Sequence, residues 1–250
     1  MERNDTPASV PKTWELPPAI RARLGVAAGR QRLMDAEGHL LLILHAVPQP
    51  EDEESRQGVF FWQAADGQWK SAPERGGLKA LQAHLGSYRK AIHGVDALTD
   101  KATRPEDYFE ALQRAHPLLR STRNLLSVLQ SAREARRLDP SLIALRDEAV
   151  DLERAIDLTT QDAKVGMDFS LAKSAQEQAA FAHQAAAEAR RLNLLAAFFF
   201  PLATLVAIFG MNSPRDVLAD GSLVGVIVVG VMIGFIVLLA VMGGKRGAGR

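Results

Sequence analysis

The stretch that decides the fold runs from Leu192 to Asn212 and reads LNLLAAFFFPLATLVAIFGMN. It contains no charged residue, and a second uncharged run extends from Leu223 to Met242 after a short polar segment. Each run has about the 20 apolar residues that a helix needs to cross a hydrocarbon layer of about 30 Å. A buried core helix is the alternative for one such run, but two adjacent runs favour a membrane hairpin. We therefore predict transmembrane helices at 192–210 and 223–243, joined by a loop at 211–222.

The charges that flank this hairpin predict its orientation. Arg190 and Arg191 precede the first span, and a basic tail at 244–250 follows the second. The loop carries one arginine, Arg215, against two aspartates. Because membrane proteins retain positive charges on the cytoplasmic side, we expect both termini in the cytoplasm and the loop outside the inner membrane.

The residues before the hairpin predict a soluble α+β head at 19–139. Short apolar runs at Arg30–Met34 and His39–Val47 flank a turn, and a second pair, Val59–Gln63 and Gln68–Ser71, flanks Asp66-Gly67. These are the signals of two β-hairpins. From Gly77 onward leucines recur at three- and four-residue spacing, which is typical of helices. Residues 1–18 are polar and lack the apolar stretch of a secretory signal, so we predict a disordered N-terminus there.

Between the head and the hairpin, residues 140–191 predict one long stalk helix. Its start follows Asp139-Pro140, and no proline occurs between Ser141 and Pro201. A helix that continued to Phe209 would be on the order of 100 Å long at 1.5 Å per residue. Gly166 is the point at which it could break. A polar helix of this length is expected to pack against its own head and against neighbouring chains.

Composition excludes several classes of function. A formal net charge of +1 argues against nucleic-acid binding. The absence of cysteine excludes thiolate metal sites and cysteine nucleophiles. The six histidines show no metal-ligand spacing, and neither a nucleotide-binding loop nor a nucleophile motif occurs. We therefore expect no enzyme activity and no cofactor.

The end of the first predicted span resembles the CorA magnesium-transporter family. The matching residues are Pro201-Leu202 and, after five residues, Ile208-Phe209-Gly210-Met211-Asn212. Close similarity covers about residues 188–246, whereas the head matches only in the order of its elements. The resemblance implies a CorA-like funnel: a homopentamer in which the first span lines the pore and Gly210, Met211 and Asn212 ring the outer mouth. It also implies Mg²⁺ as the transported ion and as a candidate regulatory ion.

The three motif residues suit this chemistry. Mg²⁺ loses its water reluctantly, and the Asn212 amide oxygen can accept hydrogen bonds from that water shell without a fixed charge. The last carbonyls of the span, around Ile208 to Gly210, lack intrahelical partners and lie at the negative end of the helix dipole. Gly210 permits unusual backbone dihedrals. A simple glycine cap followed by a loop asparagine is the alternative.

Below this mouth, one stripe of the first span has the spacing of a pore wall. Leu192 and Phe200 (or its neighbour Phe199) would form apolar rings that close a pore by dewetting. Plain lipid contact or helix packing is the alternative. The candidate pore-lining residues are Leu192, Ala196, Phe200, Ala203 and Ala207.

The chain also departs from the family pattern. The outer loop of the family carries a methionine-proline-glutamate-leucine stretch that residues 213–218 lack, and Arg215 there opposes cations. The family's pore threonine falls at Ala203, one residue before Thr204. In the family, magnesium bound by acidic side chains between heads holds the channel closed. Weak candidates for that metal site are Asp157, Asp162 and Asp168, and the alternative is a solvated helix face.

These observations leave three functions open. The first is a passive divalent-cation channel, driven by a membrane potential worth about 2.3 kcal/mol per charge per 100 mV. The second is a CorA-fold membrane scaffold or regulator without transport, which the departures in the loop favour. The third is a Zn²⁺ or Co²⁺ transporter of the same family.

Overall fold

The computed structural model describes residues 10–25, 28–49, 57–211, 225, 228–232, 234–236 and 239. The chain divides into two units, Met1–Ala172 and Lys173–Arg250. The first unit holds an antiparallel sheet, the helices packed on it and the first part of the long helix. The second holds the rest of that helix and short helical pieces of the segment after it. This arrangement confirms the α+β head with a long helix.

The sheet has four strands in the order β1-β2-β3-β4, so that each strand pairs with the next along the chain. The strands are β1 (Arg32–Ala36), β2 (His39–His45), β3 (Gly58–Gln63) and β4 (Trp69–Ala72). Ala36 pairs with His39, so the turn between β1 and β2 holds only Glu37 and Gly38. Both have positive φ, 52° and 80°, as a two-residue hairpin turn of this kind requires. The two predicted hairpins therefore become a single sheet.

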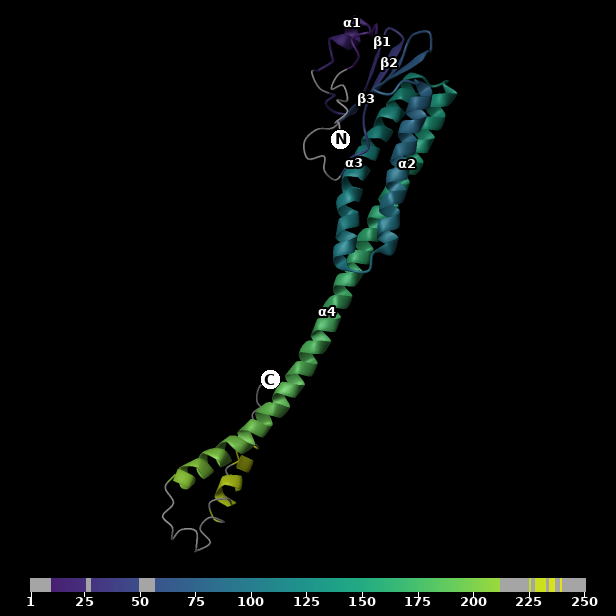
Figure 1. Ribbon diagram of the computed structural model, residues 1–250. Helices are drawn as coiled ribbons and strands as arrows, with labels where there is room; N and C mark the ends of the chain where they lie inside the picture. The colour runs from purple at the N-terminus through teal and green to yellow at the C-terminus, as the bar shows by residue number, and fades with distance from the viewer. Residues whose placement is uncertain are drawn as a thin grey trace, which may run out of the picture. The chain divides into compact units, whose positions relative to one another are not determined.

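Both faces of the sheet are buried, because side chains alternate along each strand. Leu40, Leu42 and Phe61 pack among the helices, whereas Leu41, Phe60 and Trp62 pack against the N-terminal segment. Figure 1 shows the short helix α1 (Pro18–Arg21) on the side of the sheet away from the long helices.

The N-terminal segment corrects one prediction. Val10, Trp14 and Leu16 are buried against the sheet, and the rings of Trp14 and Trp62 lie 5.6 Å apart. Residues 10–18 are therefore packed rather than disordered, because three apolar side chains cover the otherwise exposed sheet face. Nothing in this segment has helical or strand periodicity, which is why sequence patterns missed it. Residues 1–9 lie outside the described part of the chain.

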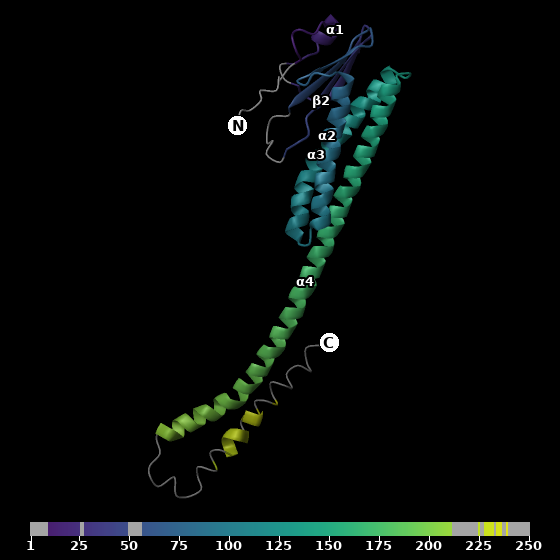
Figure 2. The ribbon, with the colours of Figure 1, turned by 45° about the vertical axis from the view of Figure 1, so that its right-hand side comes forward.

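Three helices cover the other face: α2 (Leu78–Lys101), α3 (Pro105–Ala135) and the first part of α4 (Pro140–Met211). They lie side by side in both ribbon views (Figure 1, Figure 2). Their shared core contains leucines at the expected three- and four-residue spacing and includes Leu81, Leu85, Leu118, Leu125, Leu142, Leu145 and Leu152. Pro117 lies inside α3 without ending it.

Asp139 attaches the start of α4 to the sheet. One of its carboxylate oxygens accepts hydrogen bonds from the backbone N–H groups of Ser141 (2.9 Å) and Leu142 (3.3 Å), as an N-cap does. The other accepts a hydrogen bond from the Gln63 amide of β3 at 3.1 Å. The same side chain therefore begins the helix and sets its position on the head.

α4 continues through Gly166 and through Pro201. At Gly166 the ring of Tyr108 lies where a Cβ would be, with its Cζ 2.7 Å from that position. This glycine is therefore a site of close contact between α3 and α4, and it does not break the helix. The predicted continuity of the stalk at Gly166 agrees with the observed bounds of α4.

In the part of the chain that the structure describes, no helix combines the length and the apolar character that crossing a membrane requires. Several predicted segments lie outside the described residues: the loop at 211–222 (apart from Met211), most of the second span at 223–243 and the tail at 244–250.

Candidate functional site

The candidate site lies in the second unit, along α4 from Leu192 to its last described residue, Met211. Gly210 and Met211 belong to the final helical turn that the structure describes. Asn212, the residue with the proposed ligand oxygen, lies outside the described residues, as do the side chains of Ile208 to Met211. The geometry of this site therefore comes from the helix below the motif.

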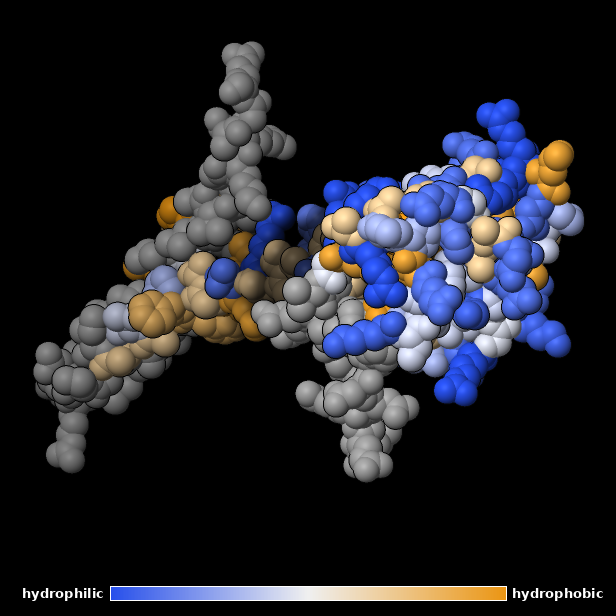
Figure 3. Space-filling model, turned by 90° about the horizontal axis from the view of Figure 1, so that it is seen from above, coloured by the Kyte–Doolittle hydropathy of each residue, from blue (hydrophilic) through white to orange (hydrophobic). Residues whose placement is uncertain are grey.

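The predicted pore-lining residues share one open face of α4. At about 100° per residue, the five positions fall within an arc of about 80°. All five are exposed, and the two large side chains, Leu192 and Phe200, are 66% and 74% exposed. Figure 3 shows apolar residues along this unit, whereas the surface of the head is mainly hydrophilic. The open stripe consists of Leu192, Ala196, Phe200, Ala203 and Ala207.

The opposite face of α4 is packed. Its half-buried residues are Leu194, Ala197, Phe198 and Pro201. A Cβ placed on Gly234 would meet the Phe198 carbonyl oxygen at 3.0 Å and the Phe198 ring at 3.4 Å. Gly234, in the segment after the loop, thus allows two backbones to approach closely, as small residues do between membrane helices. The predicted pore stripe therefore lies on the side of α4 away from Gly234.

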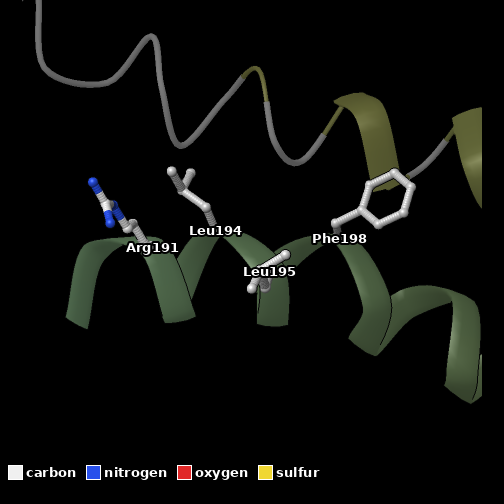
Figure 4. Close-up of a pocket in the computed structure, with 4 residues that line it drawn as sticks. All are labelled: Arg191, Leu194, Leu195 and Phe198. Atoms are coloured by element: carbon white, nitrogen blue, oxygen red, sulfur yellow. The ribbon is translucent and has the colours of Figure 1, made fainter. Parts of the chain in front are cut away.

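The boundary between the two faces carries an open groove. It has a volume of about 390 Å³ and is lined by Arg191, Leu194, Leu195 and Phe198. Arg191, Leu194 and Phe198 point to the same side of α4 (Figure 4). The groove is therefore part of the packed side of the helix, and Phe198, which lies against Gly234, is not part of the open stripe.

Phe200 is the better of the two aromatic candidates for the open stripe. Its side chain is 74% exposed, against 55% for Phe199. The Phe199 ring also packs edge-on against that of Phe198, with centroids 5.2 Å apart. The choice between Phe199 and Phe200 that the sequence left open therefore favours Phe200.

The side chain of Thr204, next to the open stripe, is bonded within its own helix. The Thr204 hydroxyl donates a hydrogen bond to the Phe200 carbonyl oxygen at 2.8 Å. Such bonds to the preceding turn satisfy the hydroxyl within its own helix. Ala203, the stripe position itself, has no polar side-chain group, so the described stripe has no side-chain oxygen at this level.

The three candidate residues for a regulatory metal lie apart in the head portion of α4. Asp157 is half-buried and forms an ion pair with Arg123 of α3 at 2.7 Å. Asp162 and Asp168 are exposed. Among the described residues, no three histidine, aspartate or glutamate side chains come together as metal ligands do.

Arg123 is the residue of this region that sequence patterns missed. Its Nε donates to a Glu153 oxygen at 2.9 Å and its Nη2 to an Asp157 oxygen at 2.7 Å. These contacts raise the pKa of the guanidinium. The available signal was the pair of acidic residues four positions apart, which a helix places on one face. Sequence alone does not show that an arginine of another helix reaches both.

A buried polar cluster lies between the sheet and the helices. The Tyr88 hydroxyl donates to the His45 carbonyl oxygen at 3.0 Å and contacts the Ser121 hydroxyl at 2.7 Å. Burial raises the pKa of Tyr88 to about 12. Burial also lowers the pKa of the adjacent His84 to about 4, partly offset by a hydrogen bond with the His45 backbone. These shifts come mainly from desolvation of the two side chains in a packed core.

Known proteins resemble this chain in structure rather than in sequence. No protein-family model matches it, and no curated protein matches it. The cytoplasmic domain of ZntB from Vibrio parahaemolyticus superposes with a TM-score of 0.53 at 10% identity, covering 65% of this chain and 80% of that domain. Over that 65% of the chain, the fold is similar to that of the ZntB cytoplasmic domain. This likeness supports the CorA-like fold predicted from the motif.

Two further solved structures match less closely. The full-length CmaX protein has a TM-score of 0.48 at 15% identity, covering 84% of this chain and 77% of that one. The CorA magnesium transporter from Methanocaldococcus jannaschii has a TM-score of 0.44 at 15% identity, covering 88% and 80%.

Proposed function

We propose that this protein is a passive channel for divalent cations, with Mg²⁺ as the expected ion. One observation carries the proposal. A head with the ZntB fold continues through one unbroken helix to Gly210-Met211, and the predicted pore stripe is the open face of that helix. The head, the helix and the motif thus occur in the order that a CorA-like channel requires.

The proposed channel is a homopentamer in the inner membrane, with both termini in the cytoplasm. In the head portion of α4, Leu158, Val165 and Phe169 are 51%, 68% and 71% exposed. They follow one another at seven and four residues, the spacing of a helix seam that packs against another helix. A single chain leaves this seam in water, and copies of the same chain would cover it.

In the proposed mechanism, five Asn212 amides hold the hydrated ion through its water shell at the outer mouth. The helix ends around Gly210 add the negative ends of five dipoles. Below them, rings of Phe200 and Leu192 form apolar constrictions that close when they lose water. Flux follows the membrane potential, and the proposal includes no catalysis.

The test is flux into liposomes that contain the purified protein, measured for Mg²⁺, Co²⁺ and Zn²⁺, together with Mg²⁺-dependent growth of a transporter-deficient strain. We expect Asn212→Ala to lower Mg²⁺ flux at least about tenfold, since one decade corresponds to about 1.4 kcal/mol of lost ion stabilisation. Asn193→Ala is the matched control, because Asn193 is the other asparagine of this apolar run and lies off the open stripe. Normal flux in Asn212→Ala would contradict the role of the motif.

A second candidate function is a membrane scaffold or regulator that does not conduct. Two observations favour it. Ala203 leaves the pore wall without a side-chain oxygen while the Thr204 hydroxyl is bonded to its own helix. The loop also carries Arg215 where the family has an acidic stretch. A stable oligomer that moves none of the three ions in liposomes would support this function over the channel. Selective flux of Zn²⁺ or Co²⁺ would instead support the third.

A further inference from the structure

One guanidinium in the head occupies the place between two carboxylates. Glu153 and Asp157 are four residues apart on α4, so they project from the same face of the helix. Arg123 of α3 donates Nε to Glu153 at 2.9 Å and Nη2 to Asp157 at 2.7 Å. The second Asp157 oxygen accepts a hydrogen bond from Gln161 at 2.6 Å. Both oxygens of this aspartate are therefore engaged within the chain.

We propose that Arg123 is a built-in cation of the head: it takes the place of a divalent ion between Glu153 and Asp157 and attaches α4 to α3 independently of divalent-cation concentration. Without a cation, two like charges one helical turn apart destabilise the helix. An arginine relieves this repulsion with a planar fork that matches carboxylate geometry.

Competition with a metal ion favours the arginine. Mg²⁺ in proteins is usually held by one or two carboxylates and keeps several waters. To bind here it would have to displace a guanidinium that is fixed on the neighbouring helix. A tethered group of this kind competes at an effective concentration in the millimolar range or above. The carboxylates are thus already neutralised when the helices are packed.

A second arginine of the helix bundle also pairs with an acidic residue of α4. Arg89 of α2 forms an ion pair with Glu148 of α4 at 2.7 Å. Among the residues that the structure describes, the acidic residues that join α4 to its neighbours by ion pairs are each held by an arginine of α2 or α3: Glu148, Glu153 and Asp157. Any divalent control of the proposed channel must therefore act elsewhere than on this face of α4. That consequence rests on the proposed function, whereas the replacement of metal by arginine does not.

The test is thermal unfolding of the full-length protein in detergent, with and without millimolar Mg²⁺ at matched ionic strength. We expect Mg²⁺ to change the Tm of the wild-type protein and the Tm of the Glu153→Gln/Asp157→Asn variant by the same amount. We expect Arg123→Gln to have a lower Tm that Mg²⁺ partly restores. Arg123→Lys, which keeps the charge, is expected to remain insensitive to Mg²⁺. Arg120→Gln, an exposed arginine on the same helix, is the matched control.

Two results would overturn the proposal. The first is a wild-type gain in Tm with Mg²⁺ that Glu153→Gln/Asp157→Asn abolishes, because the acids would then hold a metal ion in the native head. The second is an Arg123→Gln protein that responds to Mg²⁺ no more than Arg120→Gln or than Arg123→Gln/Glu153→Gln/Asp157→Asn. Because unfolding is measured without flux, a protein that transports nothing still gives a clear answer. Failure of the channel and failure of this proposal are therefore distinguishable.

Discussion

At the scale of single residues, burial determines the protonation state of His84. Its ring packs 5.7 Å from that of Phe61 and 5.3 Å from that of Tyr88. Its Nε2 has no hydrogen-bond partner in the described structure. A protonated imidazolium here would place an unsatisfied charge in a low-dielectric core, which explains the lowered pKa of about 4. The neutral ring is therefore part of the core at physiological pH.

This burial predicts acid sensitivity of the head. As the pH falls below 6.5, the ordinary histidine value, the unfolded chain binds a proton at His84. The folded chain does not bind it until about pH 4. The stability that this difference provides above pH 6.5 is therefore lost as the pH falls from 6.5 to about 4. The complete loss is about 3 kcal/mol, at 1.36 kcal/mol per pKa unit. Thermal melts between pH 7.5 and pH 5, roughly the upper part of this window, should show a smaller fall in Tm for His84→Gln than for wild type.

The control for this experiment is His93→Gln, an exposed histidine on the same helix. Its pH dependence should follow that of the wild-type protein. Parallel curves for wild type and His84→Gln would mean that another group causes the acid sensitivity.

At the scale of elements, α4 depends on a tertiary contact at Gly166 that its own sequence does not reveal. Gly166 lowers helix propensity, so it is the point at which the sequence allows this predicted long helix to break. In the structure the glycine makes room for the ring of Tyr108 from α3. Tertiary packing thus stabilises the helix at the position where local propensity is weakest.

The contact predicts that Gly166→Ala destabilises the head. The new Cβ would lie 2.7 Å from Tyr108 Cζ, and overpacking of this kind costs about 1–3 kcal/mol. In a Tyr108→Ala background the same change should become neutral or stabilising by about 0.5–1 kcal/mol, because alanine favours the helix. Gly94→Ala is the control, since nothing lies within 4 Å of its added Cβ. Equal effects of Gly166→Ala in both backgrounds, measured by unfolding, would show that Tyr108 is not the cause.

The elements also show which local patterns predict structure. The strands and helices of the head lie close to the predicted runs because alternating and heptad-like apolar spacing survives in the folded chain. The N-terminal segment did not follow from any pattern. Val10, Trp14 and Leu16 are irregularly spaced, and they are buried because they cover the second apolar face of the sheet.

At the scale of the whole molecule, the exposed seam of α4 predicts self-association. Phe169→Glu would place a charge in the proposed contact between copies, and burial of an unpaired charge is strongly unfavourable. We expect this variant to shift the protein in detergent from a pentamer toward smaller species, measured by light scattering after size exclusion. Leu138→Glu is the control, because Leu138 is 94% exposed in the turn before α4, away from the seam. A Phe169→Glu protein that keeps the wild-type mass would contradict the seam.

The sequence by itself determined the order of elements, the apolar runs and the position of the Gly210-Met211-Asn212 motif. These follow from composition and periodicity, which act over a few neighbouring residues. Tertiary structure alone decided which face of α4 is open, because the packing of Phe198 against Gly234 distinguishes one side of a uniformly apolar helix from the other. It also decided that Arg123 holds Glu153 and Asp157, because residues 30 and 34 positions apart meet only when α3 and α4 pack together.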